Sequence, residues 1–254
     1  MIRSILKSVY HNLLPLRVKN SIDLFGQLRS ENFDQPELVQ KENLRHNNIL
    51  VLAPHPDDDV IGCGGILDIY QKKGAKITIV YMTDGRKGNP NYDEDRLVLK
   101  RREEARRAAD VIGIDELMFL DNRDTELSAT PKAVKELRDI LYEVKPEAVF
   151  LPFLLDNHQD HRATNDILIR SSRTYKAPLT CYGYEIWTPL ATPNFFVNIT
   201  DQIEVKRQAI EEHHSQTELC PIDDCMLGLC RYRSLPYNLR DVYVEAFFRC
   251  NLYP

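Results

Sequence analysis

The sequence lacks the long apolar segments that mark membrane-spanning and exported proteins. No apolar run approaches the roughly 18 residues of a transmembrane helix. Residues 1–20 are basic and mildly apolar, but Lys7, His11 and Arg17 interrupt the continuous apolar core of a signal peptide. We therefore expect a cytoplasmic protein in which this stretch packs on the domain or on a partner subunit of a homo-oligomer. The alternative is peripheral contact of residues 1–20 with the anionic inner face of a membrane.

Paired cysteines are lacking too. The six cysteines form no Cys-x-x-Cys pair, and the spacing of Cys220, Cys225 and Cys230 does not match structural zinc sites. Because no export signal is visible, we expect reduced thiols that behave as small buried hydrophobes.

The chain also has no excess of positive charge. Its formal net charge is -5, and no basic stripe is interleaved with aromatic residues. Proteins that bind nucleic acids usually present a basic surface, so we expect no nucleic-acid partner. With 43% hydrophobic and 28% charged residues and no internal repeat, the composition is that of an ordinary globular protein.

From Asn47 onward, strand-like and helix-like segments alternate. The expected strands cover residues 48–53, 76–81, 117–120, 148–151, 180–187, 195–199 and 242–248. The expected helices cover residues 61–73, 93–112, 131–143, 162–175 and 203–214. This alternation with short connections predicts an α/β fold, a mostly parallel sheet with helices on both faces. We expect residues 47–254 to form a single domain and residues 1–46 to form an N-terminal helical extension.

Two polar clusters directly follow two of the expected buried strands. One cluster runs from His55 to Asp59, and the other contains His158 and His161. Two imidazoles and one carboxylate make an open zinc site, so the best ligand set is His55, His161 and either Asp57 or Asp58. The other of these two carboxylates would then face the metal-activated water as a general base.

His158 and Asp160 lie beside His161 and extend this hypothesis. A protonated His158 could stabilise a developing oxyanion, and Asp160 could hold an imidazole in its charged form. Each motif alone has an ordinary explanation, because an Asp run often caps a helix and a His-x-x-His pair often arises by chance. Their occurrence at two strand ends of one α/β chain favours the metal site.

Two other patterns are weaker. Gly62, Gly64 and Gly65 resemble a dinucleotide-binding turn, but a charged cluster separates them from the strand and the third glycine is misplaced. His213 and His214 lie at the end of an expected helix, where the helix dipole favours histidine, so we expect a structural role for them.

The motifs at residues 54–59 and 158–161 resemble those of the PIG-L or LmbE-like family of zinc-dependent N-acetylglucosaminylphosphatidylinositol deacetylases. Weaker matches lie at residues 101–105, 122–124, 184–189 and 245–247, so the resemblance extends over residues 47–248. It implies a Rossmann-like fold and hydrolysis of the N-acetyl group of an N-acetylglucosamine-type sugar or sugar conjugate.

The resemblance also implies a role for each matched site residue. His55, Asp58 and His161 would bind one Zn²⁺ per chain, with Asp57 as the general base. His158 would be the charged stabiliser of the tetrahedral intermediate, oriented by Asp160.

The chain departs from the family pattern at two positions. Asp59 stands where the family commonly has Glu, a conservative change. Arg86 stands where the family often has an acidic residue, so it would contact an anionic group of the substrate or belong to a solvated charged loop. Arg101 and Arg123 are further substrate-binding candidates, and the alternative for each is a structural ion pair.

Three other functions are open at this point. One is an amidase of a thiol–sugar conjugate, and a second is a metallophosphoesterase, which usually needs two metal ions close together. The third is a non-catalytic sugar-binding protein, which the intact Asp57 and His158 argue against.

Overall fold

The computed structural model describes residues 38–175 and 177–252, which belong to one compact unit. Residues 1–37, with the expectations for residues 1–20, lie outside the described residues. Residues 38–46 contribute the short strand β1 (Leu38–Val39) and the 3-10 helix η1 (Lys41–Asn43), so the sheet starts ahead of residue 47. No helix in the described part of the chain is long and apolar enough to cross a bilayer.

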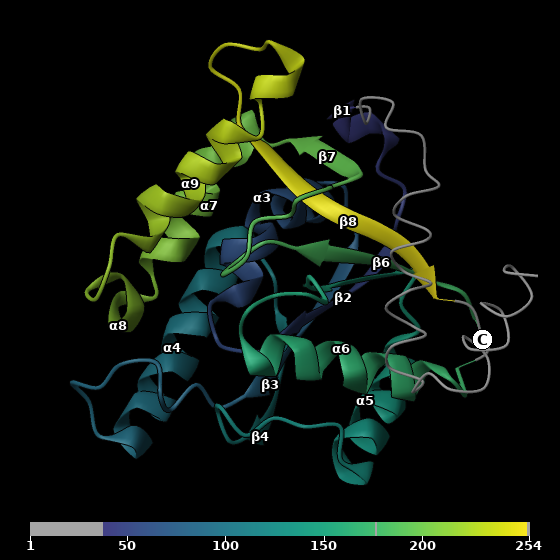
Figure 1. The fold of residues 1–254 in the computed structure, drawn as a ribbon, viewed down its shortest axis with the longest axis vertical. Helices are drawn as coiled ribbons and strands as arrows, with labels where there is room; N and C mark the ends of the chain where they lie inside the picture. Colours follow the sequence, from purple (N-terminus) through teal and green to yellow (C-terminus); the bar gives the residue numbers. More distant parts are fainter. Residues whose placement is uncertain (1–37, 176, 253–254) are drawn as a thin grey trace, which may run out of the picture. The chain divides into compact units, whose positions relative to one another are not determined.

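The described residues form one mixed sheet of eight strands in the order β1-β7-β8-β6-β5-β2-β3-β4 (Figure 1). The other strands are β2 (Asn48–Ala53), β3 (Lys76–Thr83), β4 (Glu116–Asn122), β5 (Ala148–Pro152), β6 (Leu179–Tyr184), β7 (Phe195–Asn198) and β8 (Val244–Leu252). Strands β2 to β6 pair in parallel, whereas β8 runs antiparallel to β6 and β7. The predicted mostly parallel α/β fold is confirmed.

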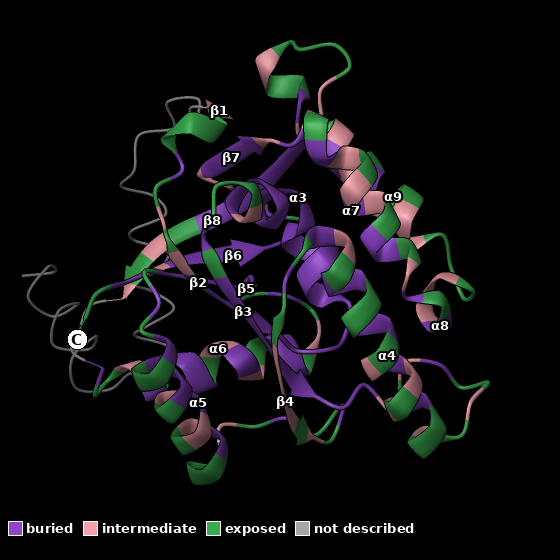
Figure 2. Ribbon diagram, turned by 180° about the vertical axis from the view of Figure 1, so that it is seen from behind, coloured by how far each residue is buried: buried purple, intermediate pink, exposed green. Residues whose placement is uncertain are grey.

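Helices cover both faces of this sheet, and the central strands between them are buried (Figure 2). The helices are α3 (Asp58–Lys72), α4 (Glu94–Ile112), α5 (Pro131–Val144), α6 (Gln159–Ser172), α7 (Ile203–Glu211), α8 (His214–Thr217) and α9 (Ile222–Tyr232), with 3-10 helices η2 (Thr200–Gln202) and η3 (Leu235–Tyr237). Ile49 and Val51 of β2 pack with α3, α4 and α7, whereas Leu50 and Leu52 pack with α5 and α6. A strand buried on both faces must be apolar throughout, which explains the continuous apolar run.

Several element boundaries differ from those expected. Helix α3 begins at Asp58 rather than residue 61, and α6 begins at Gln159 rather than residue 162. Asp58 and Asp59 therefore lie in the first turn of α3 and Asp160 in that of α6, where the helix dipole stabilises acidic residues. Strand β6 ends at Tyr184 and α7 ends at Glu211, both earlier than expected, and α8 and α9 follow without having been predicted.

The cysteine expectation is only partly correct. Cys63, Cys181 and Cys230 are buried free thiols, as predicted, but Cys220 and Cys225 are exposed. Both exposed thiols lie near the start of the unpredicted helix α9, on the solvent side of that segment.

Helix α3 is kinked at Cys63, whose φ of -145° is not helical. The kink leaves backbone groups without helical partners, and a buried ion pair between Lys206 and Glu245 binds them. The Glu245 carboxylate accepts hydrogen bonds from the Gly65 and Ile66 amides at 2.9 and 2.8 Å. The Lys206 ammonium donates to the Ile61 carbonyl at 2.8 Å and pairs with Glu245 at 2.6 Å. Lys206 and Glu245 thereby fix the orientation of the first turn of α3 relative to the rest of the helix, which the hydrogen bonds within the helix do not fix.

Candidate metal centre

The two polar clusters meet because of the strand order. The chain runs from β2 outward to β3 and β4, then returns to β5 on the other side of β2. The crevice beyond the carboxyl ends of β2 and β5 is therefore a topological switch point, the usual ligand-binding position in open α/β sheets. His55 follows β2, whereas His158 and His161 follow β5.

The ligand set expected from the sequence is brought together in this crevice. Oδ2 of Asp58 lies 3.1 Å from Nδ1 of His55 and 3.3 Å from Nε2 of His161. Asp58 is almost fully buried and His161 is fully buried. One carboxylate oxygen between two imidazoles is the arrangement that a two-histidine, one-carboxylate zinc site requires.

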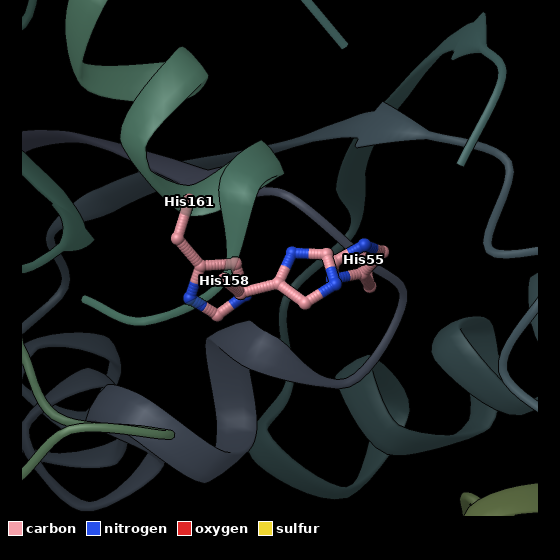
Figure 3. Close-up of side chains that lie close together, drawn as sticks. All are labelled: His55, His158 and His161. Carbon is pink, nitrogen blue, oxygen red and sulfur yellow. The ribbon is translucent and has the colours of Figure 1, made fainter. Parts of the chain in front are cut away.

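His158 completes a group of three imidazoles (Figure 3). His158 and His161 come from the start of α6, and ring nitrogens of His55, His158 and His161 lie within 4.8 Å of one another. The ring centroids of His55 and His158 are 4.7 Å apart. His158 is thus close enough to act at a ligand bound by the other two.

The surroundings of His161 suit a cation. The ring is fully buried, and its two nitrogens lie 3.3 Å from Oδ2 of Asp58 and 3.3 Å from Oδ1 of Asp156, but neither contact has hydrogen-bond geometry. Buried polar atoms are usually hydrogen-bonded, because each otherwise loses its hydration without compensation. A metal ion bound by His161 and Asp58 would satisfy Nε2 of His161, so the residues present fit the expected ion.

Asp124 and Asp160 approach the opposite nitrogen of His55. Nε2 of His55 lies 3.1 Å from Oδ1 of Asp124 and 3.3 Å from Oδ2 of Asp160. Carboxylates that contact the second nitrogen of a metal-binding histidine fix its tautomer and orientation. Residues 122–124 resembled the family turn, but their spacing carried no signal that Asp124 reaches His55.

The Asp160 carboxylate does not orient His158 in this structure. It accepts hydrogen bonds from the backbone amides of Thr125 and Leu127 at 2.7 and 3.2 Å, and it contacts His55. Only the Asp160 backbone amide reaches His158, donating to Nδ1 at 3.2 Å as part of the α6 cap. The carboxylate of Asp160 thus contacts His55 rather than His158 here, and its role in orienting His158 stays a prediction.

Asp57 has surroundings quite different from those of its neighbour Asp58. Its φ of 156° is rarely adopted by residues other than glycine, and such strain is typical of functional sites. Its carboxylate lies 3.0 Å from the guanidinium of Arg101, which is itself almost fully buried. Arg101 also donates hydrogen bonds to the carbonyls of Gly85 and Pro56 at 3.0 and 2.9 Å. Arg101 therefore holds the Asp57 carboxylate in place and joins it to the loops that contain Pro56 and Gly85.

Burial and neighbouring charges shift the pKa values of the central groups. Burial raises the pKa of Asp57 to about 6, against the opposing effect of Arg101. Burial opposes the charged form of Asp58, but His161 and His55 lower its pKa well below the usual range. Burial, followed by the charges of His55 and His161, lowers the pKa of His158. The lowered pKa of His158 disfavours its protonated form. The roles of His158 and Asp57 in catalysis stay predictions.

His55, Asp58 and His158 line a cavity of about 270 Å³. The cavity is lined by His55, Asp57, Asp58, Ile61, Lys87, Gly88, Arg101, Asp124, Thr125, His158, Ile186, Trp187, Gln216, Leu219, Cys220 and Ile222. Arg86 and Arg123 are not among these residues. Arg86 pairs with Asp84 at 2.8 Å, and Arg123 pairs with Glu126 at 3.4 Å. Sequence reasoning overlooked the residues from the end of β6 and the start of α9, although the chain's single tryptophan is one of them.

A mostly parallel sheet that carries histidines and aspartates around one point of its carboxyl edge defines an α/β protein with a candidate metal centre. The family model described as PIG-L: GlcNAc-PI de-N-acetylase matches residues 50–171. Residues 50–171 therefore form a domain of the PIG-L or LmbE-like deacetylase family.

Relatives and solved structures agree with this assignment. The diacetylchitobiose deacetylase of Thermococcus kodakarensis is 29% identical over 214 residues, covering 73% of this chain and 79% of that protein. A probable N-acetyl-alpha-D-glucosaminyl L-malate deacetylase 2 of Bacillus subtilis is 26% identical, covering 67% of this chain and 84% of that protein. The structure of the N,N'-diacetylchitobiose deacetylase from Pyrococcus horikoshii superposes with a TM-score of 0.73 at 26% identity and covers 94% of each chain.

Proposed function

We propose that this protein is a Zn²⁺-dependent N-deacetylase that hydrolyses the acetamide of an N-acetylglucosamine-type sugar or conjugate and releases acetate. The observation that carries this proposal is the position of Asp58 between His55 and His161, with Asp57 beside it on Arg101. The relatives named above act, by their names, on N-acetylated sugars.

In this proposal His55, Asp58 and His161 hold one Zn²⁺ per chain. The ion would supply Lewis-acid activation of a water molecule and of the acetamide carbonyl. Asp124 and Asp160 keep His55 oriented through its second nitrogen.

Asp57 then acts as the general base. It accepts a proton as water adds to the carbonyl carbon, and it returns the proton to the sugar nitrogen as the C–N bond breaks. The second proton of the water also passes to the nitrogen, so the products are acetate and a protonated amine, and atoms and charge balance. Arg101 keeps the Asp57 carboxylate in one position throughout. His158, the N-cap residue of α6, stabilises the negative charge that develops on the carbonyl oxygen.

A screen of N-acetylated sugar conjugates tests the proposal. Mass spectrometry should detect loss of an acetyl group from at least one conjugate, together with free acetate. The activity should disappear on chelation and return with Zn²⁺. Turnover of phosphate esters instead of acetamides would contradict the proposed reaction.

One observation supports a second candidate, a metallophosphoesterase. His55, Asp124 and Asp160 also offer donor atoms within 4.8 Å of one another, and they share His55 with the first ligand set. A second ion there would create the paired-metal site that such enzymes use. Metal stoichiometry distinguishes the candidates, because the deacetylase needs one ion per chain.

A further inference from the structure

A second cavity lies at the edge of the sheet opposite the metal centre. The metal-site histidines follow β2 and β5, whereas this cavity is lined by His46, which precedes β2, and lies near Glu147, which precedes β5. Its volume is about 450 Å³, within the range of roughly 300 to 1,000 Å³ that is usual for small-molecule sites. It shares no lining residue with the cavity at the metal centre, so it is a separate candidate site.

One wall of this cavity is a face of the paired strands β6 and β8, which lie side by side (Figure 1). Their antiparallel register places Thr180 opposite Asn251 and Tyr182 opposite Arg249. Side chains two positions apart on a strand point to the same face, so these four residues share one face. All four line the cavity, which therefore presents a hydroxyl, an amide, a phenol and a guanidinium on one wall.

The lining carries positive charge. Arg45 and Arg249 belong to it, and no aspartate or glutamate is among the described residues that line it. Burial lowers the pKa of His46, so this third basic residue stays neutral at pH 7. Outside the lining, the Glu147 carboxylate lies 4.0 Å from Nδ1 of His46 and accepts a hydrogen bond from the amide of Asn47 at 2.8 Å. In a chain with a net charge of -5, two arginines gathered in one cavity favour an anionic ligand.

The Arg249 guanidinium is positioned by aromatic side chains of the cavity. Its central carbon lies 5.2 Å from the centroid of the Phe195 ring. Burial raises the pKa of Tyr182 to about 12, and the charge of Arg249 opposes this rise, so the guanidinium also lies near the Tyr182 hydroxyl. The same hydroxyl lies 2.9 Å from Nε2 of His46. A planar guanidinium held in this way is suited to bind two oxygens of one phosphate group.

Tyr70 adds a hydrogen-bond donor that has no partner. Its side chain is 1% exposed and lines the cavity, yet its hydroxyl forms no hydrogen bond with any residue that the structure describes. Buried polar atoms usually have a partner, because each otherwise loses its hydration without compensation. The Tyr70 ring lies 6.2 Å from the His46 ring, on the inner side of the cavity. An oxygen atom of a bound ligand would satisfy this hydroxyl.

We propose that this cavity binds a small soluble phosphate monoester, with the phosphate group held by Arg45, Arg249 and the Tyr70 hydroxyl. A phosphate monoester carries about two negative charges at pH 7 and several acceptor oxygens, which match two guanidiniums and a phenol. Asn251 and Thr180 offer amide and hydroxyl groups to the polar remainder of the ester. Because the cavity is separate from the proposed catalytic centre, this site does not depend on the deacetylase function.

Isothermal titration calorimetry of the Zn²⁺-loaded protein tests the site, with glucose 6-phosphate as the probe. The ester should bind with one molecule per chain. Glucose and glucuronate should bind at least about tenfold more weakly, because the first lacks the charge and the second has fewer acceptor oxygens and less charge. Equal affinities for the ester and either of these sugars would overturn a phosphate site. So would the absence of binding for both glucose 6-phosphate and inorganic phosphate.

An arginine variant with a matched control locates the binding. Arg249→Gln should weaken the binding of glucose 6-phosphate by about tenfold, the change expected when a charge-assisted hydrogen bond is lost. Arg106→Gln is the control, because Arg106 is also exposed and lies 5.4 Å from the Phe119 ring centroid, but outside the cavity lining. It should leave the affinity unchanged. Unchanged affinity in Arg249→Gln would place the phosphate elsewhere, for example at the proposed metal ion, and would overturn the site.

Tyr70→Phe separates binding from folding. It should weaken the binding of glucose 6-phosphate about fivefold through loss of one hydrogen bond. Stability in urea should not fall, because the hydroxyl has no partner among the described residues. Wild-type affinity in Tyr70→Phe would contradict the role of the hydroxyl. Binding only to phosphatidylcholine vesicles that contain phosphatidic acid, and not to glucose 6-phosphate, would overturn a soluble ligand in favour of a lipid headgroup.

Discussion

At the scale of single residues, neighbouring carboxylates have different environments. Asp58 lies between two imidazoles, whereas Asp57 pairs with Arg101. Asp57 is the N-cap residue of α3 and Asp58 is its first residue, and successive residues at a helix start point in different directions. Of the two carboxylates, Asp58 contacts both His55 and His161, which supports the proposal that Asp58 rather than Asp57 is the metal ligand.

Replacing Asp57 by Asn should separate catalysis from metal binding. We expect kcat for acetate release to fall by about 10² to 10⁴, the usual loss when a general base is removed. Metal content should stay at the wild-type level, because Asp57 is not proposed as a ligand. Asp68→Asn is the control, since Asp68 is a buried carboxylate on the same helix that pairs with Lys72. Near-normal kcat in Asp57→Asn would contradict the assigned base.

His213 should make folding sensitive to acid. The ring is buried, its nitrogens have no hydrogen-bond partner, and burial lowers its pKa to about 3. An unfolded histidine has a pKa of about 6.5, so between pH 6.5 and 3 the unfolded chain binds the proton and the folded chain does not. This contribution to stability is therefore complete above pH 6.5 and is lost as the pH falls.

Urea unfolding at pH 7 and pH 5 measures that effect. The wild-type protein should lose about 2 kcal/mol more stability over this interval than His213→Leu does. His214→Leu is the control, because His214 is exposed at the start of α8, and it should keep the wild-type dependence. Parallel pH profiles for His213→Leu and the wild-type protein would show that His213 is not held neutral.

At the scale of secondary-structure elements, the kink of α3 depends on residues that are distant in sequence. Glu245 of β8 binds the amides exposed by the kink, and Lys206 of α7 compensates its charge. Both side chains are almost fully buried. The helix that presents the site is therefore coupled to the C-terminal part of the sheet.

Lys206→Met should destabilise the protein strongly. The Glu245 carboxylate would remain buried without its cation, and breaking a buried pair from one side costs about 3 to 5 kcal/mol. The double variant Lys206→Met with Glu245→Gln should be more stable than the single one, because the uncompensated charge is gone. Urea unfolding followed by circular dichroism compares them. Lys135→Met removes an exposed pair with Asp139 and should leave stability almost unchanged. A Lys206→Met variant as stable as this control would contradict the role of the pair.

Strand β2 could be predicted from the sequence, whereas the start of α3, which follows it, could not. The strand at residues 48–53 was predictable because burial on both faces demands a continuous apolar run. Polar residues at its end, and again after residue 151, indicated a site at one sheet edge. The start of α3 at Asp58 was missed because aspartates occur in loops as well as in first turns.

Contacts between distant segments left no signal in the spacing of residues. Arg101 approaches Asp57 only because α4 packs beside α3, and Glu245 approaches Gly65 only because β8 joins the sheet. Arg101 was therefore expected to bind substrate or to form a structural pair, and only packing could decide which group it meets. Trp187 lies within the matched residues 184–189, but the sequence indicates no role for it, because its position beside the cavity depends on the turn after β6.

At the scale of the whole described unit, the sheet order determines where chemistry can occur. Strand β2 pairs with β3 on one side and with β5 on the other, so the loops after β2 and β5 open side by side. His55 and His161 lie 106 positions apart in the sequence yet share one carboxylate oxygen. The proposed metal centre therefore depends on the complete sheet rather than on either motif alone.

The most direct test of the central claim is a zinc titration of chelated protein, with bound metal and acetate release measured on the same samples. Acetate release should rise with bound Zn²⁺ and reach its maximum at one ion per chain. His161→Ala should bind little metal and release little acetate at every point of the titration. Full acetate release by the metal-free protein, or a maximum reached only at two ions per chain, would contradict a one-zinc deacetylase.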